Sequence, residues 1–349
     1  MPRISAIATA VPDLDFEPDY RRWALSRLGE GREGKLYERM ANRSGIEHRW
    51  SVLDEADARL DEGVGFYGGE PPSTSARMAI YAKEAPELAL KAIAGLPELG
   101  RVTHLVVASC TGFVAPGIDQ IVARRLGLGA DVERVLVGFM GCYAAVTALR
   151  TARHIVRSEP LARVLVVTVE LSSLHHQEEM DLEPLLMGAQ FGDGAAAAIV
   201  TAQEAGLELG EGISAALEES DELITWRIGD TGFHMRLSGE VPGRIATALA
   251  DPVVQQRVTG GRDPGEIAAW AVHAGGRSIL DAAEKGLHLA PDALDASREV
   301  LRLCGNMSSS TLMFALKRIM RDRPESGVAL AFGPGLAMEG FRFGWADAG

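Results

Sequence analysis

Cys142 is the residue whose surroundings are most typical of a reactive group. It lies in Val-Gly-Phe-Met-Gly-Cys-Tyr-Ala-Ala, after the apolar run Val135–Val137 and at the start of a segment rich in small residues. A thiol at the N-terminus of a helix faces unpaired backbone N–H groups, which lower its pKa and favour the nucleophilic thiolate. Free cysteines are also among the most buried residue types, so the local sequence leaves a structural role equally open.

His273 and Asn306 supply two further groups that acyl-transfer chemistry requires. His273 follows the apolar run Ala-Ala-Trp-Ala-Val and precedes Ala-Gly-Gly, so we expect it where a strand end opens into a turn. There it could accept a proton from Cys142, pair with the thiolate and later donate to an oxyanion, and Asn306 could supply a second donor. Taken singly, the histidine could be a core residue and the asparagine a cap for a helix over Thr311–Arg318. The three together predict a thiol-based acyl-transfer site.

The elements that must position these residues are short apolar runs alternating with helical patterns. The runs indicate buried, largely parallel strands of an α/β fold, at residues 105–108, 135–137, 164–169, 196–200, 271–273 and 328–332. Apolar residues at three-to-four spacing predict helices at Ile118–Leu128 and Ala144–Arg157. The stretch Ala202–Gly212, rich in Glu and Gly, predicts a boundary between two halves, residues 1–203 and 204–349. The strand and helix series then starts again, so we expect a duplicated architecture without a residue-level repeat.

The composition is that of an acidic globular protein. Its 349 residues are 47% hydrophobic, enough for a large core, and the formal net charge of -13 argues against nucleic-acid binding. No apolar stretch approaches the roughly 20 residues of a membrane span, and the N-terminus lacks a signal-peptide pattern, so we expect a cytoplasmic protein. The three cysteines, Cys110, Cys142 and Cys304, fit neither a disulfide framework nor a zinc site.

Six short motifs follow one another along the chain. The three catalytic candidates lie in Gly-Cys-Tyr-Ala-Ala, Val-His-Ala-Gly-Gly and Gly-Asn-Met-Ser-Ser, and the others are Phe191-Gly-Asp-Gly-Ala-Ala-Ala, Gly232-Phe-His and Phe332-Gly-Pro-Gly. Together they resemble the signatures of type III polyketide synthases, the chalcone synthase family, over about residues 35–343. The resemblance implies the thiolase fold, a five-layered αβαβα arrangement of two related halves, as a homodimer.

The resemblance also implies a mechanism that uses coenzyme A thioesters as substrates and no bound cofactor. A starter acyl group passes from acyl-CoA to Cys142, and malonyl-CoA is then decarboxylated and condensed onto it, with His273 and Asn306 as donors to the enolate oxygen. Repeated extension and cyclisation would give a pyrone, resorcinol or phloroglucinol product. Phe191 and Phe233 match the family phenylalanines that separate the catalytic site from the coenzyme A tunnel and favour loss of the carboxylate.

Basic residues near the N-terminus match family positions that bind coenzyme A. Arg39 and Arg43 match positions that hold its phosphates, and Lys35 lies one residue from a third. By spacing alone, two arginines four residues apart would form an exposed helix face.

Four cavity positions differ from those of the plant enzymes. Cys110 replaces a threonine, Ala115 replaces a methionine that reaches into the partner's cavity, and His175 and Ile224 replace smaller residues. We therefore expect a reshaped cavity and a product other than a chalcone. The remaining cavity residues implied by the resemblance are Thr111, Ser308, Phe332, Gly333 and Pro334.

Other signals and other activities have weaker support. Gly192-Asp-Gly-Ala-Ala-Ala satisfies a dinucleotide-binding pattern, but a helical segment precedes it and a strand follows it, so we expect no nicotinamide cofactor. The group His175, His176, Glu178, Glu179 and Asp181 has the crowded spacing of a charged loop, and we expect no metal there. The open alternatives are ketoacyl synthase III or hydroxymethylglutaryl-CoA synthase, a thiol hydrolase, and a catalytically silent thiolase-fold interaction protein.

Overall fold

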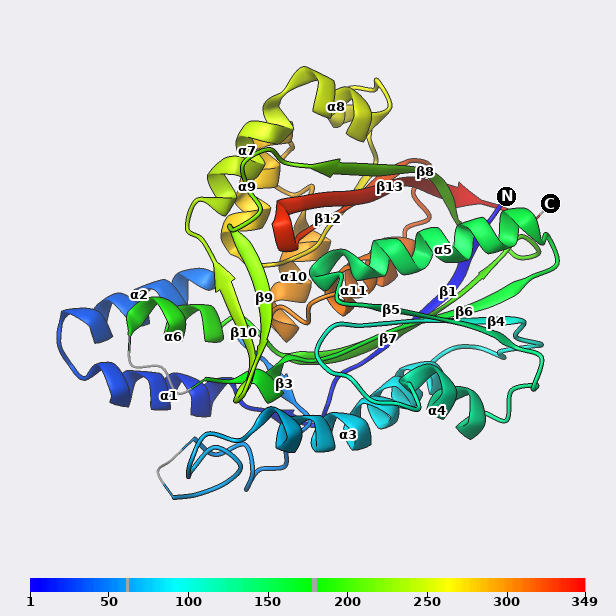
Figure 1. The fold of residues 1–349 in the computed structure, drawn as a ribbon. Helices are drawn as coiled ribbons and strands as arrows, with labels where there is room; N and C mark the ends of the chain where they lie inside the picture. The colour runs from blue at the N-terminus through cyan, green and yellow to red at the C-terminus, as the bar shows by residue number, and fades with distance from the viewer. Residues whose placement is uncertain (61–62, 178–180, 349) are drawn as a thin grey trace.

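A mixed nine-stranded sheet runs through the molecule in the computed structural model, which describes residues 1–60, 63–177 and 181–348 (Figure 1). The sheet order is β11-β12-β13-β8-β1-β7-β6-β4-β5. Its strands are β1 (Arg3–Ala10), β4 (His104–Ser109), β5 (Glu133–Gly138), β6 (Arg163–Leu171), β7 (Asp193–Thr201), β8 (Gly206–Ala216), β11 (Ala269–Val272), β12 (Gly327–Gly333) and β13 (Ala337–Ala346). Two short pairs stand apart, β2 (Leu14–Asp15) with β3 (Trp50–Ser51) and β9 (Ile224–Gly229) with β10 (Gly232–Leu237).

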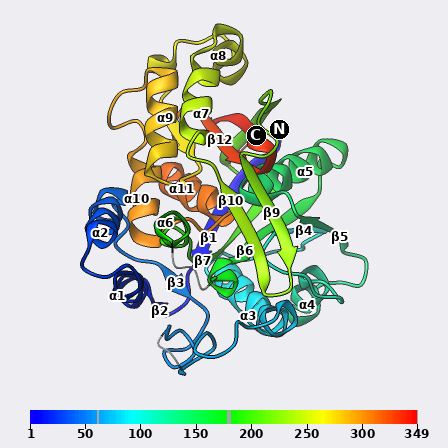
Figure 2. The ribbon, with the colours of Figure 1, turned by 60° about the vertical axis from the view of Figure 1, so that its left-hand side comes forward.

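Helices pack against both faces of the large sheet and beside the short strand pairs. They are α1 (Glu17–Leu28), α2 (Arg32–Ser44), α3 (Thr74–Ala94), α4 (Ile118–Arg125), α5 (Ala144–Ser158), α6 (Leu182–Gly188), α7 (Val241–Ala250), α8 (Pro252–Thr259), α9 (Arg277–Leu287), α10 (Asp295–Cys304) and α11 (Ser310–Met320). Figure 2 shows α1, α2 and α6 gathered beside the β9–β10 hairpin. None of the helices in the described ranges combines the length and apolar character needed to cross a bilayer.

The side chains of each buried strand alternate between two cores. In β4, Val106 faces a core that contains α5 and α11, whereas Leu105 faces a core that contains α3 and α4. In β12, Ala329 faces the same central helices and Leu330 faces α7, α9 and α10. The layers are therefore helices, sheet, helices, sheet, helices, which confirms the five-layered αβαβα fold.

The two halves of the sheet repeat one strand pattern. In the first half β4 and β6 run parallel, β7 returns antiparallel, and the first strand β1 lies beside β7. In the second half β11 and β12 run parallel, β13 returns antiparallel, and the first strand β8 lies beside β13. A short pairing of β1 with β8 joins the halves. This repeated order supports the expected duplication.

Two sequence expectations about these elements are wrong in detail. Five of the six expected strands form the parallel pairs β4–β5, β4–β6 and β11–β12, as expected, and β7 runs antiparallel to β6. The run 135–137 does not mark a buried strand, because β5 lies at the edge of the sheet and exposes Val135 and Leu136. Helix α4 ends at Arg125 rather than Leu128, because the chain turns at Gly127 with φ of 64°. Helix α5 matches the expected Ala144–Arg157 within one residue.

Candidate active site

Cys142 lies in a single 3-10 turn, Gly141–Tyr143, between the end of β5 and the start of α5. The turn requires a glycine at 141, because Gly141 has φ of 71° and a Cβ there would lie 2.4 Å from Cδ of Pro334. A Cβ at Gly333 would meet the ring of Tyr143 at 2.7 Å. Gly333 and Pro334, from the second half of the chain, therefore pack directly against the cysteine turn of the first half.

Hydrogen bonds link Cys142 to Asn306 through Ser308, and Cys142, Asn306 and His273 are all buried. The hydroxyl of Ser308 donates to Sγ of Cys142 at 3.9 Å, and the backbone N–H of Ser308 donates to Oδ1 of Asn306 at 2.8 Å. Nδ2 of Asn306 donates at 3.1 Å to the carbonyl of Gly275, two residues after His273. Neither ring nitrogen of His273 has a hydrogen-bond partner among the described residues. The structure thus joins Cys142 to Asn306 and places His273 on the segment that Asn306 contacts.

The serines after Asn306 do not cap α11. The helix begins at Ser310 with no side-chain cap, because the hydroxyl of Ser309 donates to Glu170 and that of Ser310 donates to the carbonyl of Gly194. Asn306 is not a cap either, since its amide is bound to Gly275 and Ser308. These side chains hold the site together across the two halves.

Loss of water dominates the electrostatics of the catalytic candidates. Burial raises the pKa of the Cys142 thiol to about 12, although the hydrogen bond from Ser308 opposes the shift. The expected lowering of this pKa at a helix N-terminus is therefore wrong for the substrate-free protein. Burial lowers the pKa of His273 to about 4, which keeps the imidazole neutral. Each pKa shift reflects the free-energy cost of burying one unpaired charge. A thiolate on Cys142 and an imidazolium on His273 that form together would carry no net charge.

Glu170, which the sequence analysis did not single out, lies beneath the cysteine. It is fully buried near the end of β6, and its Oε2 accepts from the backbone N–H of Cys110 and from the hydroxyl of Thr111, both at 2.9 Å. The hydroxyl of Ser309 donates to its other oxygen. Burial raises the pKa of this carboxyl group to about 7 despite these donors. The available signal was a charged residue directly after the apolar run 164–169.

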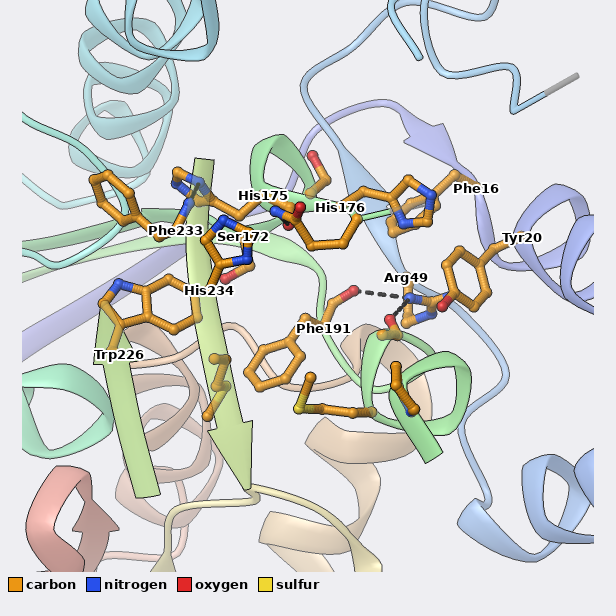
Figure 3. A pocket seen from close by; sticks show the side chains of 16 residues that line it. Phe16, Tyr20, Arg49, Ser172, His175, His176, Phe191, Trp226, Phe233 and His234 are labelled. Atoms are coloured by element: carbon orange, nitrogen blue, oxygen red, sulfur yellow. Dashed lines mark hydrogen bonds between the residues drawn. The ribbon is translucent and has the colours of Figure 1, made fainter. Parts of the chain in front are cut away.

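Phe191 and Phe233 line one pocket together with His175 and Trp226 (Figure 3). The ring of His175 stacks on that of Phe233, with centroids 4.2 Å apart and planes 14° apart. Nδ1 of His175 accepts from the backbone N–H of Phe233 at 3.0 Å, so Nε2 carries the proton and donates it to the carbonyl of Thr111 at 2.6 Å. Burial lowers the pKa of His175 to about 4, so the ring stays neutral. His175 therefore fixes the position of Phe233.

Phe191 is held through its backbone. It forms a bridge with Asn306, and its carbonyl accepts a hydrogen bond from Arg49 at 3.0 Å (Figure 3). The side chain of Arg49 is fully buried, pairs with Glu17, and lies over the ring of Phe16. No sequence pattern indicated this arginine, because its contacts come from residues distant in the chain.

The remaining predicted cavity residues divide into two groups. Cys110 lies at the site, since its Sγ accepts from the backbone N–H of Gly141 at 3.0 Å. Ala115 is exposed in the loop between β4 and α4. Ile224 and Phe332 are buried in the core that also contains α7 and α9. The structure therefore connects Cys110, Thr111, Ser308, Gly333 and Pro334 directly with the site.

The basic residues of α2 are exposed, as their spacing suggests. Arg43 lines a surface cavity of about 360 Å³ together with Arg277 and Gln190, whereas neither Lys35 nor Arg39 is among the residues described around it. Arg277, the first residue of α9, donates to the carbonyl of Arg43 at 3.1 Å. The carbonyl of Gln190 accepts from the backbone N–H of Asn306 at 2.7 Å, so this cavity borders the catalytic region.

The motifs set aside from the sequence have the expected context. Gly192 directly precedes β7, so a strand rather than a helix follows the glycines. Both ring nitrogens of His175 are engaged in hydrogen bonds. Glu178 and Glu179, which completed the crowded acidic group, lie outside the described residues.

Comparison with known proteins places nearly the whole chain in one family. Residues 8–204 match the N-terminal domain of chalcone and stilbene synthases, and residues 208–343 match the C-terminal domain. The alpha-pyrone synthesis polyketide synthase-like Pks18 of Mycobacterium tuberculosis is 33% identical over 322 residues, which cover 87% of this chain and 81% of that protein. The structure of 1,3,6,8-tetrahydroxynaphthalene synthase from Streptomyces coelicolor A3(2) has a TM-score of 0.87 at 25% identity, covering 99% of this chain and 100% of the other. A structure of CsyB complexed with CoA-SH shares the fold, with a TM-score of 0.86 at 22% identity over 99% of this chain and 100% of the other.

The chain belongs to the chalcone and stilbene synthase family. It is a type III polyketide synthase, an acyltransferase that performs decarboxylative condensation. This assignment decides against the ketoacyl synthase III and hydroxymethylglutaryl-CoA synthase alternatives, and against a thiol hydrolase or a silent interaction protein.

Proposed function

We propose that Cys142 carries the growing acyl chain and that His273 and Asn306 bind the oxygens of its thioester substrates. The observation that carries this proposal is the set of contacts that joins buried Cys142 to Asn306 through Ser308 and joins Asn306 to Gly275, two residues from buried His273. In loading, the thiol proton of Cys142 passes to neutral His273 and the sulfur attacks the carbonyl of acyl-CoA. Coenzyme A then leaves as a thiol and takes the proton from His273.

The extension step uses the same donors. Malonyl-CoA loses CO₂, and the electron pair of the broken bond forms an enolate whose oxygen accepts from His273 and from the second N–H of the Asn306 amide. The enolate carbon attacks the acyl thioester, the bond to Cys142 Sγ breaks, and the chain becomes two carbons longer on coenzyme A. Phe191 and Phe233 give the carboxylate a poorly solvating wall, which favours its loss as neutral CO₂.

Coenzyme A thioesters enter, on this proposal, through the cavity between α2, α6 and α9. Two cationic side chains, Arg43 and Arg277, line it and suit the phosphates of the nucleotide end, while Gln190 lies where the cavity borders Asn306. Arg39 and Lys35, exposed on the same helix, would bind at most the outermost phosphate. The bound coenzyme of the CsyB structure supports a coenzyme A site in this fold.

The product is proposed to be a pyrone, resorcinol or phloroglucinol, and the similarity to Pks18 favours the pyrone. His175 adds an imidazole to the wall that holds Phe233, and this side chain narrows the cavity on that side. A short polyketide that closes through one of its own oxygens needs less space than a chalcone.

The active protein is proposed to be a cytoplasmic homodimer. Strand β5 is at the edge of the sheet and exposes Val135 and Leu136, and the neighbouring Phe113 and Phe139 are 63% and 60% exposed. An apolar edge strand of this kind is unfavourable in water, and a second copy of the chain would cover it. Ala115 lies on the same exposed loop as Phe113, where the partner's cavity could receive it.

Incubation of the purified protein with a panel of acyl-CoA starters and radiolabelled malonyl-CoA tests the proposal. We expect CO₂ release and a cyclised product identified by mass spectrometry. Cys142→Ala should abolish the product but leave malonyl decarboxylation measurable, because the enolate needs only His273 and Asn306. His273→Ala should reduce both, and Cys304→Ala, which removes another buried thiol, should retain both. Normal product formation by Cys142→Ala would contradict the assignment.

A further inference from the structure

A second group of side chains with chemical potential lies at the amino ends of β4 and β5, opposite the strand ends that lead to the active site. His104 and Glu133 are the first residues of these strands and lie directly beside each other in the parallel register. Glu159 is the C-cap residue that directly follows α5. One nitrogen or oxygen atom from each of the three lies within 4.8 Å of the others.

Thr103 orients the His104 ring. Its hydroxyl accepts from the N–H of Arg163 at 3.0 Å and lies 3.2 Å from the carbonyl of Arg163. The hydroxyl also lies 2.9 Å from Nδ1 of His104, and the ring donates in this contact when the hydroxyl proton points to Arg163. With the proton on Nδ1, neutral His104 presents the lone pair of Nε2 to the two glutamates. A hydrogen bond from the second ring nitrogen is the usual way in which proteins orient a metal-binding histidine.

The charges around Nε2 favour a cation. This nitrogen lies 3.8 Å from a carboxylate oxygen of Glu133 and 3.8 Å from one of Glu159, which is too long for a hydrogen bond. Within the described ranges, His104 is the sole ion-pair partner recorded for either glutamate. The C-terminal end of α5 adds further negative potential at Glu159. The side chain of His104 is only 7% exposed, so its nitrogen is held in place while the two carboxylates can move.

We propose that His104, Glu133 and Glu159 form a site for a divalent first-row transition-metal ion, and we assign it to Zn²⁺. A nitrogen ligand with carboxylates suits zinc, whereas Mg²⁺ and Ca²⁺ prefer oxygen ligands alone. Tetrahedral zinc with bonds of about 2.0–2.2 Å sets its ligand atoms roughly 3.3–3.5 Å apart. Each glutamate oxygen would thus move about half an ångström closer to Nε2 of His104, and water would complete the coordination. The ion would join β4, β5 and α5 at a site separate from the catalytic one.

The test is equilibrium dialysis of chelator-treated protein against Zn²⁺, with bound metal measured by mass spectrometry. A Cys142→Ala background removes the reactive thiol as a competing ligand. We expect one zinc ion that is lost, or bound at least tenfold more weakly, in His104→Ala and in the double variant Glu133→Gln/Glu159→Gln. His154→Ala, which removes an exposed histidine of the same helix, is the matched control and should bind as the parent does.

Two variants separate loss of zinc binding from loss of folding. The glutamine double variant alters only exposed side chains, so it carries the test even if His104→Ala folds poorly. Thr103→Val should weaken zinc binding about tenfold through loss of the second-sphere hydrogen bond. Equal zinc stoichiometry and affinity in the parent and the glutamine double variant would overturn the proposal. Displacement of the zinc by an equal concentration of Mg²⁺ would overturn the assignment to a transition metal.

Discussion

Replacing His273 by alanine is expected to make Cys142 much less reactive toward iodoacetamide at neutral pH. Burial raises the pKa of the thiol from an ordinary value of 9.0 to about 12, a penalty of about 4 kcal/mol on the thiolate. An imidazolium about 4 Å from a thiolate returns roughly 4 kcal/mol at the effective dielectric of a protein site. Burial also opposes the imidazolium, since it lowers the pKa of His273 to about 4, so charge pairing alone offsets the combined penalty only in part. A charge-assisted hydrogen bond between the two groups would add about 1.5–3 kcal/mol to their attraction. Without it, the full cost of burying a lone charge remains.

The assay is the second-order rate of Cys142 alkylation between pH 5 and pH 10, followed by peptide mass spectrometry. We expect the midpoint of the profile to rise by at least two pH units in His273→Ala, with a corresponding loss of rate of about 100-fold below the new midpoint. Cys304, another buried thiol whose pKa burial raises to about 11, provides an internal reference that should label slowly in both proteins. An unchanged midpoint in His273→Ala would refute the idea that His273 offsets the burial of the thiolate.

Three other predictions concern the rest of the structure. Burial raises the pKa of Glu170 to about 7. Between about pH 4.5 and 7, the folded protein therefore keeps a proton on Glu170 that the unfolded protein has lost. As a result, Glu170 makes the folded state less stable as the pH rises through this range. In urea unfolding, the wild type should lose about 2–3 kcal/mol more stability between pH 5 and 8 than Glu170→Gln, and equal losses would show that Glu170 is not the group involved. Arg43→Glu should raise KM for malonyl-CoA about tenfold. KM for the malonyl thioester of N-acetylcysteamine should not change, because this substrate lacks the nucleotide. An equal rise in KM for both thioesters would argue against a phosphate contact. Leu136→Arg should convert a dimer to a monomer in analytical ultracentrifugation, whereas Val253→Arg, at a 66% exposed side chain of α8, should not; a dimeric Leu136→Arg would place the interface elsewhere.

Local sequence patterns were sufficient to place Cys142 and His273 on the right kinds of element, but not Asn306. Cys142 does precede a helix at 144, and His273 does follow a strand and open into a Gly-rich turn, because apolar runs and glycines report burial and chain reversal directly. The antiparallel direction of β7 was not accessible in this way, since a strand buried on both faces reads the same whether its neighbour is parallel or antiparallel. We inferred that the three residues share one site because they occur together in the sequence and because their motifs resemble those of the family.

Properties that depend on the whole environment could not be predicted. The helix N-terminus near Cys142 suggested a lowered thiol pKa, but burial by residues from both halves outweighs it. Glu170 was visible as a charge after an apolar run, yet its partners Cys110 and Ser309 come from distant loops. His104 likewise meets Glu159 only because α5 ends beside the start of β4. Contacts of this kind are set by the folded chain as a whole and leave no spacing signal.

Trapping the acyl-enzyme tests the central claim most directly. The protein is incubated with one acyl-CoA starter in the absence of malonyl-CoA, and its intact mass and cysteine-containing peptides are measured before and after malonyl-CoA is added. The account predicts a single acyl adduct on Cys142 that disappears on addition of malonyl-CoA as the extended product forms. Product formation with the adduct on another residue, or with an adduct on Cys142 that persists unchanged, would contradict it.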